Sequence, residues 1–207
     1  MFRQASLFGS EDPSYDDTFA GSARSALSGA SWIEHVPAWL SGSDALFDDL
    51  MDVLDFRQRT AIPMYDRLVD EPRLTCWWNE SESSRVPVPI LDDVRWELGE
   101  RYRCHFDSIG FNLYRDQSDS VAWHADRHRR VVTDPVVAIL SVGESRPFQM
   151  RRSDDGDGHG ASLTWGLGHG DLFVMGGACQ HEWQHRVPKR RRPTGPRLSI
   201  TFRHDAR

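Results

Sequence analysis

The spacing of apolar residues differs between the two halves of the chain. Near the N-terminal end it is helical: leucine, phenylalanine and methionine occupy positions 46, 47, 50, 51 and 54, and aspartates take the opposite side. We expect Ser43 or Asp44 to cap this helix. Residues 91–104 repeat the helical spacing. The pattern therefore predicts two amphipathic helices, each with one face packed on a core.

Short apolar runs follow from residue 106 onward, bounded by Gly, Asp or Pro as strands commonly are. Residues 31–36 form a further predicted strand, which precedes the first helix. The predicted strands of the second half are residues 111–114, 136–142, 147–151, 162–165, 171–175 and 197–202. Many short strands that close on themselves favour a jelly-roll barrel. The expected fold class is mainly β with flanking helices (α+β).

The length of 207 residues is typical of one structural domain. Within it, residues 1–29 are rich in small and acidic residues and predict a flexible tail. We expect residues 30–104 to form an N-terminal extension with the buttressing helices and a lid. Residues 105–205 then form the barrel core.

Cysteine usage and hydropathy bear on where the protein works. The three cysteines are widely spaced and form no CxxC pair, which favours a reducing cytosol and argues against a zinc–thiolate site. No apolar run approaches the 18 residues of a membrane span, and the N-terminus lacks a signal-peptide pattern. We expect a cytoplasmic protein without a membrane partner and, since no dimer interface is evident, a monomer.

Charge is distributed unevenly. The net charge is −6, but acidic residues concentrate between residues 10 and 100. Positive charge gathers in the second half, in the runs 127–130, 151–152 and 189–192. Such runs are either solvated loops or a basic rim that attracts phosphate in spite of the overall charge.

Two histidines and an aspartate form the strongest chemical signal. His124 and Asp126 are two residues apart, so on a strand both side chains project from one face. His185, on a neighbouring strand, would complete the two-histidine, one-carboxylate set that holds non-haem Fe(II) with open positions. His181 competes for the third position.

The last predicted strand alternates polar and apolar residues. Arg197, Ser199, Thr201 and Arg203 take one face, and leucine, isoleucine and phenylalanine take the other. Arginines that face a metal indicate a dicarboxylate co-substrate, because a guanidinium binds a carboxylate through two parallel hydrogen bonds.

Four ordered motifs in residues 60–205 resemble the AlkB family of nucleic-acid dealkylases. They are Asn112-x-Tyr114, His124-x-Asp126, a distal His185 twelve residues before Arg197, and Arg197-x-Ser-x-Thr-x-Arg203. The resemblance implies a double-stranded β-helix (jelly-roll) core with Fe(II), and with 2-oxoglutarate and O2 as co-substrates. It implies that Asn112, Tyr114, Arg197, Ser199, Thr201 and Arg203 surround 2-oxoglutarate.

The implied reaction is oxidative demethylation of N-alkylated bases. It would release formaldehyde while 2-oxoglutarate is converted to succinate and CO2, and would repair DNA, or RNA, by direct reversal. A base must leave its stack to reach the metal, which favours single-stranded DNA as the partner. The sequence leaves open which nucleic acid and which methylated base are preferred.

Substrate contacts are expected from aromatic and basic residues. Trp77 and Trp78 are the candidates for a lid that stacks on the base, with hydrophobic core as the alternative. Trp123 is expected to pack inside the barrel. The candidates for contacts with the nucleic acid are Arg127, His128, Arg130 and Lys189.

Two positions depart from the family pattern. Ser199 stands where the family usually has Asn, which predicts slightly weaker co-substrate binding or a bridging water. His128 replaces a frequent acidic residue near the base and predicts a narrower or more pH-sensitive range of lesions.

Two other functions fit parts of the pattern. A 2-oxoglutarate oxygenase that acts on protein or a small molecule would carry most of the same motifs, because fold and iron chemistry do not set the substrate. A non-catalytic, cupin-like binding module would keep the barrel alone. Intact metal and arginine positions argue against the second alternative.

Overall fold

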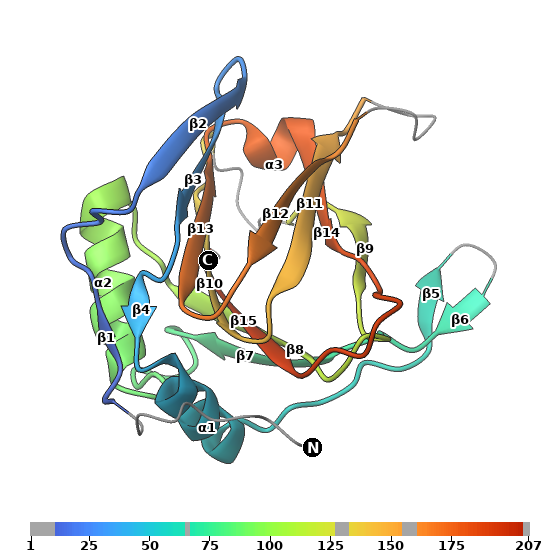
Figure 1. Cartoon of the computed structure of the whole chain (residues 1–207), viewed down its shortest axis with the longest axis horizontal. Coiled ribbons are helices and arrows are strands. Elements are labelled where there is room, and N and C mark those ends of the chain that lie inside the picture. Colours follow the sequence, from blue (N-terminus) through green and yellow to red (C-terminus); the bar gives the residue numbers. More distant parts are fainter. Residues whose placement is uncertain (1–10, 65–66, 127–132, 155–160, 205–207) are drawn as a thin grey trace.

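The structure is a computed structural model, and it describes residues 11–64, 67–126, 133–154 and 161–204 (Figure 1). In chain order its elements are β1 (Ser14–Tyr15), β2 (Ala23–Ser28), β3 (Ser31–Val36), β4 (Leu40–Ser41), α1 (Ser43–Val53), β5 (Ile62–Met64), β6 (Arg67–Val69), β7 (Leu74–Asn79), α2 (Ile90–Tyr102), β8 (Ser108–Tyr114), β9 (Val121–His124), β10 (Val137–Gly143), β11 (Arg146–Arg152), β12 (Leu163–Leu167), β13 (Asp171–Gly176), α3 (Cys179–Glu182), β14 (Trp183–Val187) and β15 (Arg197–Arg203). Both predicted helices and all seven predicted strands are present, with ends that shift by a few residues.

Two antiparallel sheets contain most of the strands in the described part of the chain. The larger has seven strands in the order β2-β3-β13-β10-β15-β8-β7, and the smaller has four in the order β12-β11-β14-β9. The sheets face each other, and α1 and α2 lie outside the larger one (Figure 1). Strands that alternate between two facing sheets are a jelly roll, so the predicted fold class is confirmed.

The larger sheet is covered on both faces. Its β10, β13 and β15 are buried at almost every position. One apolar core lies between this sheet and the helices, where Leu50 of α1 and Leu98 of α2 join Ile200 of β15. A second core lies between the two sheets and includes Phe148 and Phe173. Doubly covered strands read as continuous apolar runs for this reason.

The smaller sheet has one open face. Buried and part-exposed residues alternate along β11 and β14, and the buried set, which includes Met150 and His185, points toward the larger sheet. Alternation is the pattern expected of a sheet with one solvated face.

Two predictions about the N-terminal region are wrong. The residue that caps α1 is Gly42, with a positive φ of 63°, and neither Ser43 nor Asp44 provides a side-chain cap. A Cβ atom at Gly42 would lie 2.5 Å from the Glu11 carbonyl oxygen, so the close packing of this chain segment requires glycine. The Ser43 hydroxyl instead donates to the Leu40 carbonyl.

The expected tail is also partly ordered, because β1 and β2 lie within residues 14–28. β2 pairs with β3, and there the Ser22 hydroxyl donates to Glu34 and the Arg24 guanidinium stacks on Trp32. The residues of β2 are mostly polar or small, so their spacing shows no apolar pattern that would predict a strand. Among the described residues, no helix is long and apolar enough to span a membrane.

Candidate metal and co-substrate site

A cavity of about 400 Å³ lies between the two sheets and is lined by every metal and co-substrate candidate singled out from the sequence, apart from the alternative ligand His181. Its walls are Arg59, Ile62, Arg73, Trp77, Asn112, Tyr114, Val121, His124, Ala125, Asp126, Ile139, Phe148, His185, Val187, Arg197, Ser199, Thr201 and Arg203. The alternation predicted for β15 explains its contribution. The arginines, Ser199 and Thr201 face the cavity, while Leu198, Ile200 and Phe202 pack toward the helices.

The metal candidates converge at one end of this cavity. His124 ends β9 and is the direct cross-strand partner of His185 on β14. Asp126 lies two residues beyond, after the strand has ended, and its backbone N–H donates to Gln180 Oε1 at 2.9 Å. The side-chain ligand atoms of the three residues lie within 4.8 Å of one another. His185 lies on the strand next to that of His124, as expected, whereas Asp126 is not part of the strand.

The protonation of this group suits metal binding. His124 Nδ1 lies 2.8 Å from the Ala122 carbonyl and donates to it, so Nε2 is the ring nitrogen that can face a metal. Burial, with a contribution from His124, lowers the pKa of His185 to about 3, so this imidazole is neutral. Two imidazoles and a carboxylate fit a divalent iron ion held on one face. His181 lies exposed on α3 and outside the cluster.

Arg203 orients the carboxylate. Its Nη2 donates to Asp126 Oδ1 at 2.6 Å, and its guanidinium carbon lies 5.0 Å from the centre of the Trp77 ring. Asp126 is thus held between a charged donor and the two histidines, whose Nε2 atoms are 4.0 and 3.9 Å from its oxygens. Charge-assisted hydrogen bonds of this kind fix a metal ligand in one orientation.

Arg197 forms the opposite end of the cavity. It is 1 % exposed, and its Nε donates to Ser141 Oγ at 2.8 Å. Its two terminal nitrogens are buried and find no hydrogen-bond acceptor among the residues that the structure describes. Burial lowers the pKa of Arg197 to about 10, so the guanidinium stays charged at neutral pH. A buried cation with two free donors fits a carboxylate, as the co-substrate assignment requires.

Tyr114 and Asn112 complete this end from β8. The Tyr114 ring centre is 5.5 Å from the Arg197 guanidinium carbon, and burial raises the pKa of its phenol. Asn112 is the cross-strand partner of Ser199 and accepts a 2.9 Å hydrogen bond from Arg73 Nε. Ser199 is itself buried in the cavity wall.

Sequence reasoning missed Arg73. It links Asn112 to Glu71, whose Oε1 lies 2.7 Å from Arg73 Nη2, and it lines the cavity. Its partner Asn112 is 39 residues away, so no local spacing indicated the contact. The only available signal was its place just before the strand that carries Trp77.

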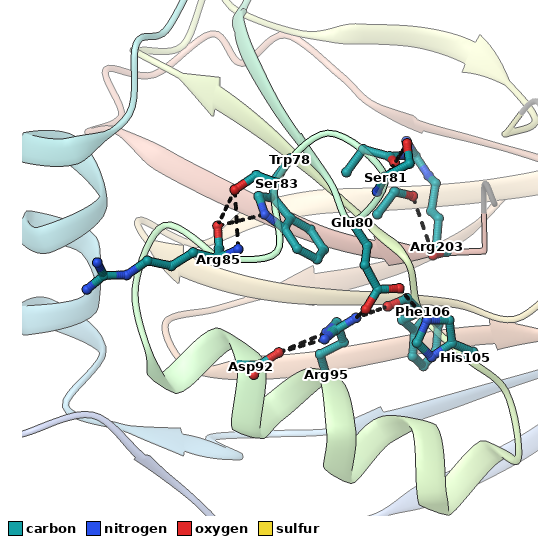
Figure 2. Close-up of polar contacts among 12 residues, drawn as sticks. Trp78, Glu80, Ser81, Ser83, Arg85, Asp92, Arg95, His105, Phe106 and Arg203 are labelled. Atoms are coloured by element: carbon teal, nitrogen blue, oxygen red, sulfur yellow. Dashed lines mark hydrogen bonds and ion pairs between the residues drawn. The ribbon is translucent and has the colours of Figure 1, made fainter. Parts of the chain in front are cut away.

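The adjacent residues Trp77 and Trp78 differ in their exposure to solvent. Trp77 is 54 % exposed and lines the cavity, where its ring packs against Gly110 so closely that a Cβ there would lie 3.0 Å from it. Trp78 is 6 % exposed in the helix-side core, and its Nε1 donates to the Arg85 carbonyl at 2.9 Å (Figure 2). The lid prediction is therefore wrong for Trp78, because adjacent strand residues point to opposite faces.

Four further residues were expected to contact the nucleic acid. Arg127, His128 and Arg130 lie outside the described residues. Lys189 is exposed and lines a second hollow of about 700 Å³ beside the cavity.

A further residue missed from the sequence is Arg146, the first residue of β11. It is fully buried and donates to three backbone carbonyls, those of Asp116, Asp119 and Pro188, at 2.8 to 3.0 Å. Its guanidinium carbon lies 5.6 Å from the Tyr114 ring centre. Arg146 thus ties the turn before β9 to the segment that follows β14, and so braces both strands that carry the histidines.

Comparison with known proteins agrees with this site. Residues 79–203 match the 2OG-Fe(II) oxygenase superfamily. Alpha-ketoglutarate-dependent dioxygenase alkB homolog 3 of Bos taurus is 36 % identical over 178 residues, which cover 79 % of this chain and 62 % of the relative. DNA oxidative demethylase ALKBH2 of Arabidopsis thaliana is 37 % identical over 183 residues, which cover 70 % of this chain and 57 % of the relative. The chain thus spans about three fifths of the length of these curated relatives.

A solved structure supports the fold. The structure of OsALKBH1 superimposes with a TM-score of 0.57 at 16 % identity and covers 87 % of this chain and 100 % of its own.

Proposed function

Because the chain belongs to the 2OG-Fe(II) oxygenase superfamily and within it to the AlkB family, we propose that it oxidatively demethylates N-alkylated bases in DNA, or in RNA. The observation that carries the proposal is that one cavity joins the cluster of His124, Asp126 and His185 to the buried cation Arg197. The names of the relatives, an alkB-homologue dioxygenase and a DNA oxidative demethylase, support the same substrate class.

The residues of the chain have distinct roles in this reaction. His124, Asp126 and His185 would hold Fe(II), and Arg203 keeps the Asp126 carboxylate oriented. When bound, iron with 2-oxoglutarate and O2 supplies the oxidising chemistry that hydroxylates an N-methyl group, while 2-oxoglutarate becomes succinate and CO2. The hydroxymethyl group then leaves the base as formaldehyde.

Arg197 would bind the carboxylate of 2-oxoglutarate that is remote from the metal, through its two unengaged terminal nitrogens. Tyr114, Asn112, Ser199 and Thr201 line the same cavity and would confine the co-substrate. Fixing the co-substrate at both ends holds its reactive end beside the metal, and such orientation lowers the barrier entropically.

Trp77 would stack on the flipped base. Its ring is half-exposed at the cavity wall and is held by Gly110 on one side and by Arg203. A base that must leave its stack costs least when it is damaged or single-stranded, so we propose single-stranded DNA as the preferred partner. A cytoplasmic location and a monomeric state remain predictions from the sequence.

The test is to incubate the protein with Fe(II), ascorbate, 2-oxoglutarate and a single-stranded oligonucleotide that carries one 3-methylcytosine. Mass spectrometry follows loss of the methyl group, and succinate is measured in parallel. We expect demethylation in the wild type and in His181→Ala, whose imidazole lies outside the cluster, and none in His124→Ala.

Succinate without demethylation of any methylated base in DNA or RNA would point to a protein or small-molecule substrate. Absence of both products would favour a non-catalytic binding module.

A further inference from the structure

The outer face of the smaller sheet carries an aromatic and basic cluster. The guanidinium carbons of Arg151 and Arg186 lie 4.6 and 4.4 Å from the centre of the Trp123 ring. Trp123 was expected inside the barrel, but it is only partly buried and lies with the outward-facing arginines of β11 and β14. We call these three residues the Trp123 patch.

Neutral side chains hold both guanidiniums in place. Arg151 donates through Nε and Nη2 to Gln184 Oε1, at 3.1 and 2.9 Å. Arg186 donates through Nε to Gln149 Oε1 at 2.7 Å. Within the described ranges, neither arginine has a carboxylate within 4.0 Å. The structure therefore fixes two cations against one indole ring, and no carboxylate of the described residues neutralises either of them.

Such a pair has a cost that an anion would remove. The pKa of Arg186 is lowered, mainly by its partial burial and to a smaller extent by the positive charge of Arg151. A like charge nearby disfavours the charged form of a group, so the second effect is a repulsion between the two arginines. A phosphate between two guanidiniums would replace this repulsion with charge-assisted hydrogen bonds. The glutamines leave other N–H groups of both arginines available for that purpose.

A hollow of about 700 Å³ connects the patch with the cavity. Trp123, Arg186 and Lys189 line it, and so do four residues that also line the cavity, namely Ile62, Arg73, Val121 and His124. Its lining comes from β9 on one side and from the β5–β6 hairpin on the other, and Figure 1 shows these elements next to each other. A molecule with one unit at the metal could thus continue without interruption to Arg186.

The opposite wall of the hollow carries the acidic residues. Asp70 Oδ1 accepts the Ala61 N–H, and Glu71 pairs with Arg73. Arg186 and Lys189 lie on the other wall, formed by β9 and β14, and among the described residues neither pairs with a carboxylate. This polarity guides a polyanion along that wall and away from the hairpin.

We propose that the Trp123 patch and Lys189 bind the phosphodiester backbone of the strand whose base enters the cavity. The inference rests on the proposed function for the identity of that strand. It assigns a position-fixing role to the patch, because contacts with phosphates set the register of a nucleic acid on a protein without reading its sequence.

The test measures binding apart from turnover. Fluorescence anisotropy of the full chain would follow a labelled, unmethylated single-stranded oligothymidine over a range of salt concentrations. The double variant Arg151→Gln/Arg186→Gln should lose two phosphate contacts. Its affinity should then fall roughly 25-fold at about 0.1 M salt, and the slope of log K against log[salt] should flatten by about 1.4.

Matched variants and a matched probe separate charge from folding. Arg24→Gln removes another guanidinium that stacks on a tryptophan, 3.6 Å from the Trp32 ring centre in the other sheet, and should leave affinity unchanged. Arg151→Lys/Arg186→Lys should restore most of the affinity and the slope. A methylphosphonate oligothymidine, which has the same bases and no backbone charge, should bind the wild type and the glutamine variant equally.

Equal affinity of the double glutamine variant and Arg24→Gln for the phosphodiester probe would overturn the proposal. So would an equal loss on both probes, because the arginines would then act through the bases or through folding. Demethylation of the methylated oligonucleotide is measured separately. Its absence in the wild type with every methylated base tested in DNA and RNA would refute the proposed function and leave the binding result to decide whether the patch holds phosphates.

Discussion

The two sheets around the cavity contrast in their surroundings. The seven-stranded sheet is covered on both faces, by the helices on one side and the smaller sheet on the other, and β10, β13 and β15 are buried along almost their whole length. The four-stranded sheet is covered on one face only, and polar residues alternate with buried ones. Each environment suits a different part of the reaction.

The covered sheet supplies the dry end of the cavity. There Arg197 is desolvated with its terminal nitrogens unengaged among the described residues, so a carboxylate that replaces lost water binds strongly. The four-stranded sheet supplies the end of the cavity that is nearer to solvent. Its inner face carries His124 and His185, and its outer face carries the Trp123 patch, so one sheet can present both a metal site and a surface for a macromolecule.

The largest effect is expected from Arg197→Met, which removes the buried cation from the covered sheet. Each charge-assisted hydrogen bond contributes about 1.5–3 kcal/mol, so two of them predict at least roughly a hundredfold rise in KM for 2-oxoglutarate. Arg197→Lys keeps the charge with a single donor group, so its KM for 2-oxoglutarate should lie between those of the wild type and Arg197→Met. Succinate formation against 2-oxoglutarate concentration measures the effect, and an unchanged KM would place the co-substrate elsewhere.

Removal of core volume should distinguish the two sheets in stability. Ile200→Ala leaves a cavity in the fully buried β15 and should lower the free energy of unfolding by about 2–5 kcal/mol. Thr164→Ala, on the exposed part of β12, should change it by about 0.5 kcal/mol or less. Denaturant unfolding measures both, and similar losses for the two variants would contradict the difference in covering.

Trp77→Ala tests whether a base stacks at the solvent-exposed wall of the cavity. Stacking of a base on an aromatic ring contributes about 1–3 kcal/mol, so the variant should lose roughly tenfold to a hundredfold in kcat/KM for a methylated oligonucleotide. The KM for 2-oxoglutarate should not change. Trp96→Ala is the matched control, since this ring is 66 % exposed on α2 and does not line the cavity. Equal losses in both variants would rule out base stacking by Trp77.

The smallest effect concerns the attachment of α2 to the covered sheet. Burial alone would raise the pKa of Glu34, but hydrogen bonds from Ser22 and Arg101 outweigh it and lower the pKa below its ordinary value of 4.5. A lowered carboxyl pKa adds stability above the unfolded-state pKa, and this stability is lost as pH falls through the folded-state pKa. Glu34→Gln should therefore cost roughly 1 kcal/mol at neutral pH and progressively less below about pH 4.

Thermal unfolding of Glu34→Gln between pH 7 and 3 measures this dependence. Glu100→Gln, on the exposed side of α2, is the control and should follow the wild type. A stability difference between Glu34→Gln and the wild type that stays constant with pH would show that the carboxylate contributes nothing as a charge.

The sequence predicted the elements whose signal is local. Helical spacing and short apolar runs come from burial, and this is why α1, α2 and the core strands were found. The strand β2 was missed because its residues are mostly polar or exposed, and β5 and β6 were missed because three residues each are too short to show a periodic apolar pattern. The order of strands in the sheets depends on contacts between distant residues, which spacing does not encode.

The site was predictable where motif residues carry its chemistry, and less so where packing does. His124, Asp126 and His185 meet as expected. Trp78 was misassigned because the sequence does not tell which of two adjacent tryptophans faces the core. Arg146 gave no signal at all, since its acceptors are backbone carbonyls of residues 27 to 42 positions away, and any residue type supplies a carbonyl.

Arg146 also limits how the chain can change in length. Its side chain binds the backbone at Asp116, Asp119 and Pro188 at once, so the turn between β8 and β9 has a fixed number of residues although it lies near the surface. Insertions are usually tolerated in surface turns. One extra residue here would shift β9 by one position and turn His124 toward the outer face of the sheet, because side chains alternate along a strand. The turn therefore acts as a spacer that sets the register of the metal ligands.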